Sequence, residues 1–140
     1  MECTIRWAGP DTMSFIAETG SGHSFVMDGA TEGGGRNLGP RPMEAVLAGS
    51  AACTAYDVVL ILKKSGLDVQ ACEVITTSER AEVDPKVFTK IHLLFRVRGR
   101  QLKANLVERA IQLSSTKYCS ATKMLGMTAL ITTSYELSEW

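Results

Sequence analysis

The sequence predicts an α+β fold in a single domain spanning residues 1–140. Three observations lead to this class. A meander of short strands occupies residues 1–28, a long helix follows at 42–65, and a strand hairpin, two helices and a last strand fill 68–137. The predicted order is therefore β-β-β-α-β-β-α-α-β. Because strands and helices do not alternate regularly, this order favours an α+β fold over a parallel α/β fold.

Turn residues divide the first segment into three strands. The runs at 4–7, 13–18 and 24–27 are separated by Gly9-Pro10-Asp11 and by Gly20-Ser21-Gly22. The glycine-rich stretch at 29–40 is predicted to be a mobile loop. It is not a phosphate-binding loop, because Arg36-Asn37-Leu38 follows its glycines where a P-loop needs Gly-Lys and then Ser or Thr.

The long helix is predicted to begin at Pro42, because proline suits the first helical turn. It ends before Gly66, and Lys63 and Lys64 complement its C-terminal dipole. Residues 45–55 carry no charge and are mostly small. A helix that is apolar on all sides is expected to be buried on all sides. We therefore expect this helix to lie at the centre of the molecule.

The remaining chain predicts a hairpin of strands at 68–78 and 87–97, joined by a charged turn. Apolar residues spaced for one helix face follow between 102 and 113. Ser114-Ser115-Thr116 is expected to break this helix and to cap a second one, which carries Tyr118 and Cys119. The last strand is predicted at 127–137.

Composition excludes several classes of protein. Fifteen basic and fifteen acidic residues give a net charge of zero, so no global field attracts nucleic acid or an anionic membrane. The N-terminus does not resemble a signal peptide, and no apolar run is expected to reach the roughly 18 residues that cross a bilayer. A cytoplasmic protein without a membrane partner is predicted. The four cysteines contain no C-x-x-C pair, so neither a structural metal site nor a secreted disulfide scaffold is expected.

Two of the cysteines fall on predicted helices, Cys53 on the long one and Cys119 on the last. A thiolate that attacks a peroxide becomes a sulfenic acid, and a second thiol nearby converts it to a disulfide. The alternative is that both are small buried hydrophobes. That alternative is favoured for Cys3 and Cys72, which fall on predicted strands.

The segment 42–59, PMEAVLAGSAACTAYDVV, and the later Lys117-Tyr118-Cys119-Ser120 resemble the osmotically inducible protein C and organic hydroperoxide resistance (OsmC/Ohr) family, in particular its YhfA-like branch. The resemblance implies a thiol-dependent peroxidase with Cys53 as the peroxidatic and Cys119 as the resolving cysteine. It also implies an intertwined homodimer with active sites at the subunit interface, a hydroperoxide substrate and an external dithiol reductant. It implies no metal and no bound cofactor.

A peroxidatic thiol must ionise near neutral pH, whereas a free thiol has a pKa of about 8.5. In the hydroperoxide branch, an arginine held by a glutamate directly after the helix-opening proline favours the thiolate. Here Met43 occupies that position and Glu44 comes next. At about 100° per residue, Glu44 faces away from Cys53 of its own chain. Glu44 would serve the partner's site, or only favour the helix N-terminus.

Arg36, Arg41 and Arg6 are the candidates for the activating arginine, and none lies in a matching motif. Asp57, one turn after Cys53, is expected to repel its thiolate. These departures leave two alternatives to a peroxidase. One is a non-catalytic protein of the same dimeric fold that binds a small lipophilic molecule at the interface. The other is a redox sensor whose disulfide changes a partner interaction.

Overall fold

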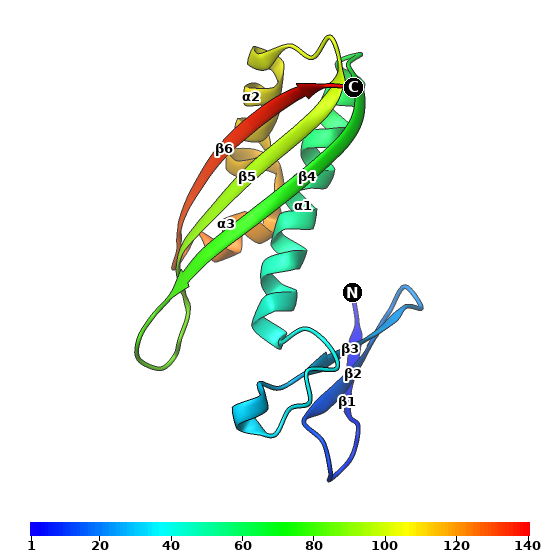
Figure 1. Ribbon diagram of the computed structural model, residues 1–140, viewed down its shortest axis with the longest axis vertical. Helices are drawn as coiled ribbons and strands as arrows, with labels where there is room; N and C mark the ends of the chain where they lie inside the picture. The colour runs from blue at the N-terminus through cyan, green and yellow to red at the C-terminus, as the bar shows by residue number, and fades with distance from the viewer. The chain divides into compact units, whose positions relative to one another are not determined.

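The computed structural model describes all of residues 1–140 and confirms the predicted order of elements. The chain forms two compact units, Met1–Leu47 and Ala48–Trp140. Figure 1 shows the strands of the first unit in blue and the sheet of the second unit in green to red. The fold is the predicted mixture of helices and two small sheets.

The first unit contains an antiparallel sheet in the order β1-β2-β3. Its strands are β1 (Cys3–Trp7), β2 (Ser14–Thr19) and β3 (Ser24–Asp28), within a residue or two of the predicted runs. Gly9 and Gly22 have positive φ, which explains why glycine occupies both turns. All of β1 is exposed, so the expectation that Cys3 fills a core is wrong.

The loop after β3 is folded around one buried carboxylate. The Asp28 carboxylate accepts hydrogen bonds from the backbone N–H groups of Gly29 (2.8 Å), Arg36 (2.9 Å) and Leu38 (3.0 Å). The N–H of Leu38 contributes most to lowering the pKa of Asp28, against the opposing effect of burial. These bonds tie residues 29–38, which the sequence predicts to be a mobile loop, to the end of β3.

The second unit is built on a sheet in the order β4-β5-β6. Its strands are β4 (Asp68–Arg80), β5 (Phe88–Arg100) and β6 (Leu130–Glu139); β4 and β5 are antiparallel, whereas β5 and β6 are parallel. The helices lie behind this sheet in Figure 1. The buried side chains of central strand β5 alternate along the chain, and they are Ile91, Leu93, Phe95 and Val97.

Helix α1 spans Pro42–Lys64, as predicted. Its buried residues within the second unit recur at every fourth position, and they are Ser50, Thr54, Val58 and Leu62. The prediction of burial on all sides is wrong, because the rest of the chain covers only one face. Tyr56 is 69% exposed and Leu60 is 37% exposed on the uncovered side.

By length and composition alone, α1 is the one helix able to cross a membrane. The expectation that no apolar segment is long enough to cross a bilayer is therefore wrong when helix length and mean hydropathy are the criteria. The core helix of a globular protein passes the same test, and 22% of the tested window of α1 is buried. The covered face of α1 is polar at Ser50 and Thr54, which are both buried.

The crossover from β5 to β6 departs from prediction at one point. Helix α2 (Ala104–Leu113) continues through a π-helical turn at Ser114–Tyr118, and α3 (Ser120–Leu125) begins only after Cys119. The predicted Ser-Ser-Thr cap is wrong, because Ser115 and Thr116 donate their hydroxyls back to the carbonyls of Ile111 and Gln112. β6 also begins later than predicted, at Leu130, after a turn at 126–128.

Candidate active site

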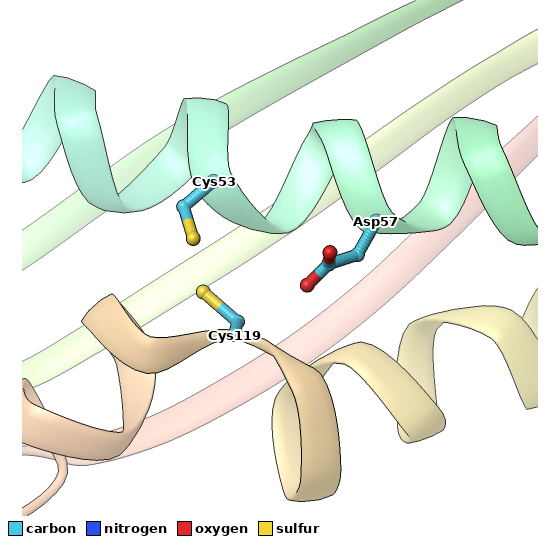
Figure 2. A group of neighbouring side chains, drawn as sticks. All are labelled: Cys53, Asp57 and Cys119. Carbon is cyan, nitrogen blue, oxygen red and sulfur yellow. The ribbon is translucent and has the colours of Figure 1, made fainter.

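Three side chains of the second unit meet between α1 and the start of α3. Figure 2 shows Cys53 and Asp57 projecting from α1 toward Cys119 on the facing segment. Their two sulfurs and the nearest carboxylate oxygen all lie within 4.8 Å of one another. We call Cys53, Asp57 and Cys119 the thiol cluster. The two cysteines that the sequence singles out are therefore neighbours in space.

The periodicity of α1 explains how its half of the cluster is assembled. Ser50, Cys53, Thr54 and Asp57 stand at positions i, i+3, i+4 and i+7, which share one helix face. Ser50 and Thr54 are buried, whereas Cys53 and Asp57 are half-buried. This face is the polar one of an otherwise apolar helix. The spacing of these polar residues is the signal that could have revealed the site from the sequence.

Cys119 occupies the N-cap of α3, with an extended backbone conformation (φ −74°, ψ 106°). Its side chain is 3% exposed, and its Sγ accepts a hydrogen bond from the backbone N–H of Thr122 at 3.5 Å. On the other side, the Oγ1 of Thr54 lies 3.3 Å from Cys119 Sγ and 3.0 Å from the carbonyl oxygen of Ser50. The sulfur is thus held between two threonines, one from each helix.

These contacts set the acidity of Cys119. Burial raises the pKa of the Cys119 thiol, but hydrogen bonds from Thr122 and Thr54 favour the thiolate more strongly, and the pKa is lowered overall. The Cys53 thiol also contributes by donating to the Cys119 sulfur. The hydrogen bonds thus favour a negative charge on Cys119.

Cys53 has the opposite tendency. Its pKa is raised, first by burial, then by its hydrogen bond to Cys119, and also by the charges of Cys119 and Asp57. The backbone N–H of Ala121 opposes this rise. The first proton that the pair loses therefore leaves the charge on Cys119, with Cys53 as the protonated partner.

Asp57 brings a carboxylate to the cluster without a cation. The Oγ of fully buried Ser114 donates to Asp57 Oδ2 at 3.0 Å and lies 3.5 Å from the carbonyl oxygen of Thr54. None of the six ion pairs of the chain includes Asp57. The sequence placed Asp57 on the face of Cys53, as the structure has it, but it did not indicate the roles of Thr54, Ser114 and Thr122.

The candidate activating residues Arg36, Arg41 and Glu44 belong to the first unit, where each has its own partners. The guanidinium of Arg36 donates to the carbonyl oxygen of Asp11 at 2.9 Å. Glu44 accepts from the backbone N–H of Arg41 at 2.9 Å and from its guanidinium at 3.2 Å. The Arg41 N–H is the main cause of the lowered pKa of Glu44. This arrangement resembles a capping box and favours the helix N-terminus.

Comparison with known proteins gives the lineage of the chain. Residues 33–134 match the model of the OsmC-like protein family. "Protein YhfA" of Escherichia coli K12 is 44% identical over 137 residues, which are 98% of either chain. A structure solved in structural genomics is 43% identical and covers 100% of both chains, with a TM-score of 0.89.

More distant structures share the fold alone. The organic hydroperoxide resistance protein OhrB of Bacillus subtilis is 18% identical and covers 96% of both chains, with a TM-score of 0.60. The family match extends over most of the chain, and the E. coli relative is similar over nearly its whole length. The chain therefore belongs to the OsmC-like family.

Proposed function

We propose that this protein is a thiol-dependent peroxidase that reduces organic hydroperoxides through Cys53 and Cys119. The observation that carries the proposal is the approach of the two sulfurs to within 4.8 Å inside one cluster. Family membership adds support, since a structural neighbour bears the name organic hydroperoxide resistance protein. The substrate would be a hydroperoxide in the cytoplasm, and an external dithiol would restore the reduced pair.

The proposed reaction has two steps. In the first, Cys53 passes its proton to the Cys119 thiolate, and the resulting Cys53 thiolate attacks the terminal peroxide oxygen and breaks the O–O bond. Cys53 becomes a sulfenic acid, and the alkoxide takes that proton from the Cys119 thiol and leaves as an alcohol. In the second step, the Cys119 thiolate attacks the sulfenic sulfur. A disulfide forms, and the departing hydroxide takes a proton to become water.

The second step requires the two sulfurs to come closer together. They lie within 4.8 Å of each other, whereas a disulfide requires a separation of about 2.05 Å. Side-chain rotation at Cys53, which is only half-buried, can bring its sulfur toward Cys119. Cys119 itself is held by Thr54 and Thr122 and is the less mobile of the two. Two electrons from an external dithiol then return the disulfide to two thiols.

We also propose that the active form is a homodimer. The uncovered face of α1 supports this, because Tyr56 and Leu60 expose apolar surface that a second copy of the chain could cover. In such a dimer, Arg36, Arg41 or Glu44 of one subunit would act on Cys53 of the other. Their present contacts with Asp11 and with each other are the interactions they would have to exchange.

The test is turnover of an organic hydroperoxide with a dithiol reductant, together with the loss of free thiols. Cys53→Ser should abolish turnover, and Cys119→Ser should stop it after one oxidation. Cys72→Ser is the matched control, since Cys72 is a half-buried thiol of β4 outside the cluster. Unchanged turnover in Cys53→Ser would refute the proposal.

A redox sensor is the second candidate, and one observation favours it. Burial and Asp57 disfavour the Cys53 thiolate, and no ion pair with Asp57 offsets that effect. Such a thiol is oxidised slowly. Complete disulfide formation by one equivalent of peroxide, without sustained turnover in the presence of a dithiol, would identify a sensor rather than a peroxidase.

A further inference from the structure

The thiol cluster has the composition of a metal site. It is a group of two cysteines and one aspartate with one donor atom from each side chain within 4.8 Å of the others. Two of these residues stand at i and i+4 on α1, and the third comes from the crossover segment. Pairs of ligands at i and i+4 on one helix are a recurring way to build zinc sites.

We propose that the reduced thiol cluster binds one Zn²⁺ ion through the sulfurs of Cys53 and Cys119 and one carboxylate oxygen of Asp57, with a fourth position open to water. This inference does not depend on peroxidase activity. It assigns to the same residues a second, metal-binding state.

The distances fit a tetrahedral site after small movements. With Zn–S at about 2.3 Å and Zn–O at about 2.1 Å, tetrahedral angles put two sulfurs roughly 3.8 Å apart and a sulfur and an oxygen roughly 3.6 Å apart. The upper limit of 4.8 Å in the cluster is therefore at most about 1.2 Å longer than the spacing that zinc requires. Half-buried Cys53 and Asp57 can supply this movement by side-chain rotation.

The surrounding hydrogen bonds are of the kind that orient metal ligands. Ser114 donates to Asp57 Oδ2 at 3.0 Å, which leaves Oδ1 free of that bond. Thr122 and Thr54 fix the Cys119 sulfur at 3.5 Å and 3.3 Å. Outer partners such as these hold ligands in the geometry that a metal needs, and their loss typically weakens binding by roughly 10–100-fold.

Charge and softness select the class of ion. Two thiolates and a carboxylate form a group of three negative charges, and none of the ion pairs of the chain neutralises it. Thiolate ligands favour Zn²⁺ over the hard ions Mg²⁺ and Ca²⁺, which take oxygen ligands. Three protein ligands and one open position match zinc sites that keep a water molecule.

The site would exist only in the reduced protein. Oxidation of the two thiolates by a hydroperoxide removes two electrons and forms the disulfide, and the peroxide oxygens leave as alcohol and water after taking up two protons. Only the Asp57 carboxylate then remains as a ligand, so the ion is released. Bound Zn²⁺ conversely occupies both sulfurs and protects them from oxidation.

The experiment titrates anaerobically reduced protein with Zn²⁺ in competition with a chromophoric chelator, and with Co²⁺ to record the thiolate charge-transfer absorption. One equivalent should bind. Cys53→Ser and Cys119→Ser should each weaken binding by at least about 100-fold, and Asp57→Asn and Ser114→Ala by at least about tenfold. Circular dichroism checks that each variant is folded. The double variant Cys3→Ser/Cys72→Ser is the matched control and should bind as the original chain does.

Three results would each overturn the inference. They are equal Zn²⁺ affinity in Cys53→Ser and the original chain, loss of binding in Cys3→Ser/Cys72→Ser, and retention of the ion by the disulfide form. Peroxidase turnover is measured separately, with a chelator present. A protein that turns over peroxide but binds no zinc refutes only the metal site. A protein that binds zinc but shows no turnover refutes only the peroxidase.

Discussion

Thr54→Val is the substitution that most directly tests how the site favours a thiolate. Thr54 is fully buried, and its Oγ1 lies 3.3 Å from Cys119 Sγ and 3.0 Å from the carbonyl oxygen of Ser50. Valine has nearly the same shape but no hydroxyl. The variant therefore removes one donor from the Cys119 thiolate while α1 keeps its packing, and the pKa of Cys119 should rise.

The size of the effect follows from what the hydroxyl can do. A hydrogen bond to a charged group contributes about 1.5–3 kcal/mol. The single proton of Thr54 must leave the Ser50 carbonyl to serve the thiolate, and sulfur is a weak acceptor, so about 1 kcal/mol is the better figure. That corresponds to a roughly fivefold smaller thiolate population below the pKa.

The assay is the rate of alkylation at Cys119 with iodoacetamide, resolved from Cys53 by mass spectrometry of peptides. Rates are measured from about pH 6 to about pH 9, which brackets the pKa of a free thiol. At the acidic end, Thr54→Val should react about fivefold more slowly, because fewer molecules carry the thiolate. At the alkaline end the difference should disappear, since both proteins are then ionised.

Thr54→Ser is the control, because serine keeps the hydroxyl and loses one methyl group. It should retain the alkylation profile of the original chain even if its stability falls slightly. Equal alkylation rates in Thr54→Val and the original chain at every pH would refute the reasoning. So would a slower rate that persists at high pH, since that pattern reports access to the sulfur rather than its ionisation.

Four further predictions concern other parts of the chain. The pKa of Asp28 is lowered in the folded protein, so its ionised carboxylate stabilises the fold. This stability is fully present above the pKa of an unfolded aspartate, about 3.9, and is lost as the pH falls through the pKa that Asp28 has in the folded protein. Asp28→Asn should therefore make unfolding, followed by circular dichroism, less sensitive to acid. Leu62→Ala should lower the free energy of unfolding by about 2–5 kcal/mol in a urea titration, because Leu62 is fully buried, whereas exposed Leu60→Ala should cost far less. Tyr56→Glu should shift a dimer toward monomer in light scattering if the uncovered face of α1 is the interface, and an unchanged mass would remove that face from consideration. Arg36→Ala and Arg41→Ala should slow peroxide turnover if these arginines act on Cys53. Turnover equal to that of the original chain in both variants would exclude such a role.

The fold could be predicted well because its local signals agree with one another. Pro42, Lys63, Lys64 and Gly66 mark both ends of α1, and the structure has it at Pro42–Lys64. Turn residues likewise separate the three strands of the first sheet. The burial of α1 was harder to predict, because an apolar helix surface can be covered by the same chain or by another one, and the sequence pattern is the same in both cases. The structure covers the Ser50–Thr54–Val58 face and leaves Tyr56 exposed.

The site could be predicted only in part. The positions of Cys53 and Asp57 on one helix face follow from the spacing alone. The contact with Cys119 does not, since it depends on how the crossover packs against α1. Nor does the hydrogen bond between Thr54 and Cys119, for the same reason. Ser114–Thr116 show a different ambiguity, because their sequence also suits a helix cap: they form part of a π-helical turn, and the capping position passes to Cys119.

The parallel pairing of β5 and β6 has a consequence for how such a protein can change over evolutionary time. Parallel neighbours cannot be joined by a tight turn, so residues 101–129 must form a long connection that returns to the start of the sheet. Cys119 lies on that connection, whereas the ladder of β5 and β6 is fixed by the strands themselves. Insertions or deletions around the π-helical turn can therefore shift one sulfur relative to the other while the sheet stays intact. In this architecture, the spacing of the reactive groups is adjustable independently of the framework that supports them.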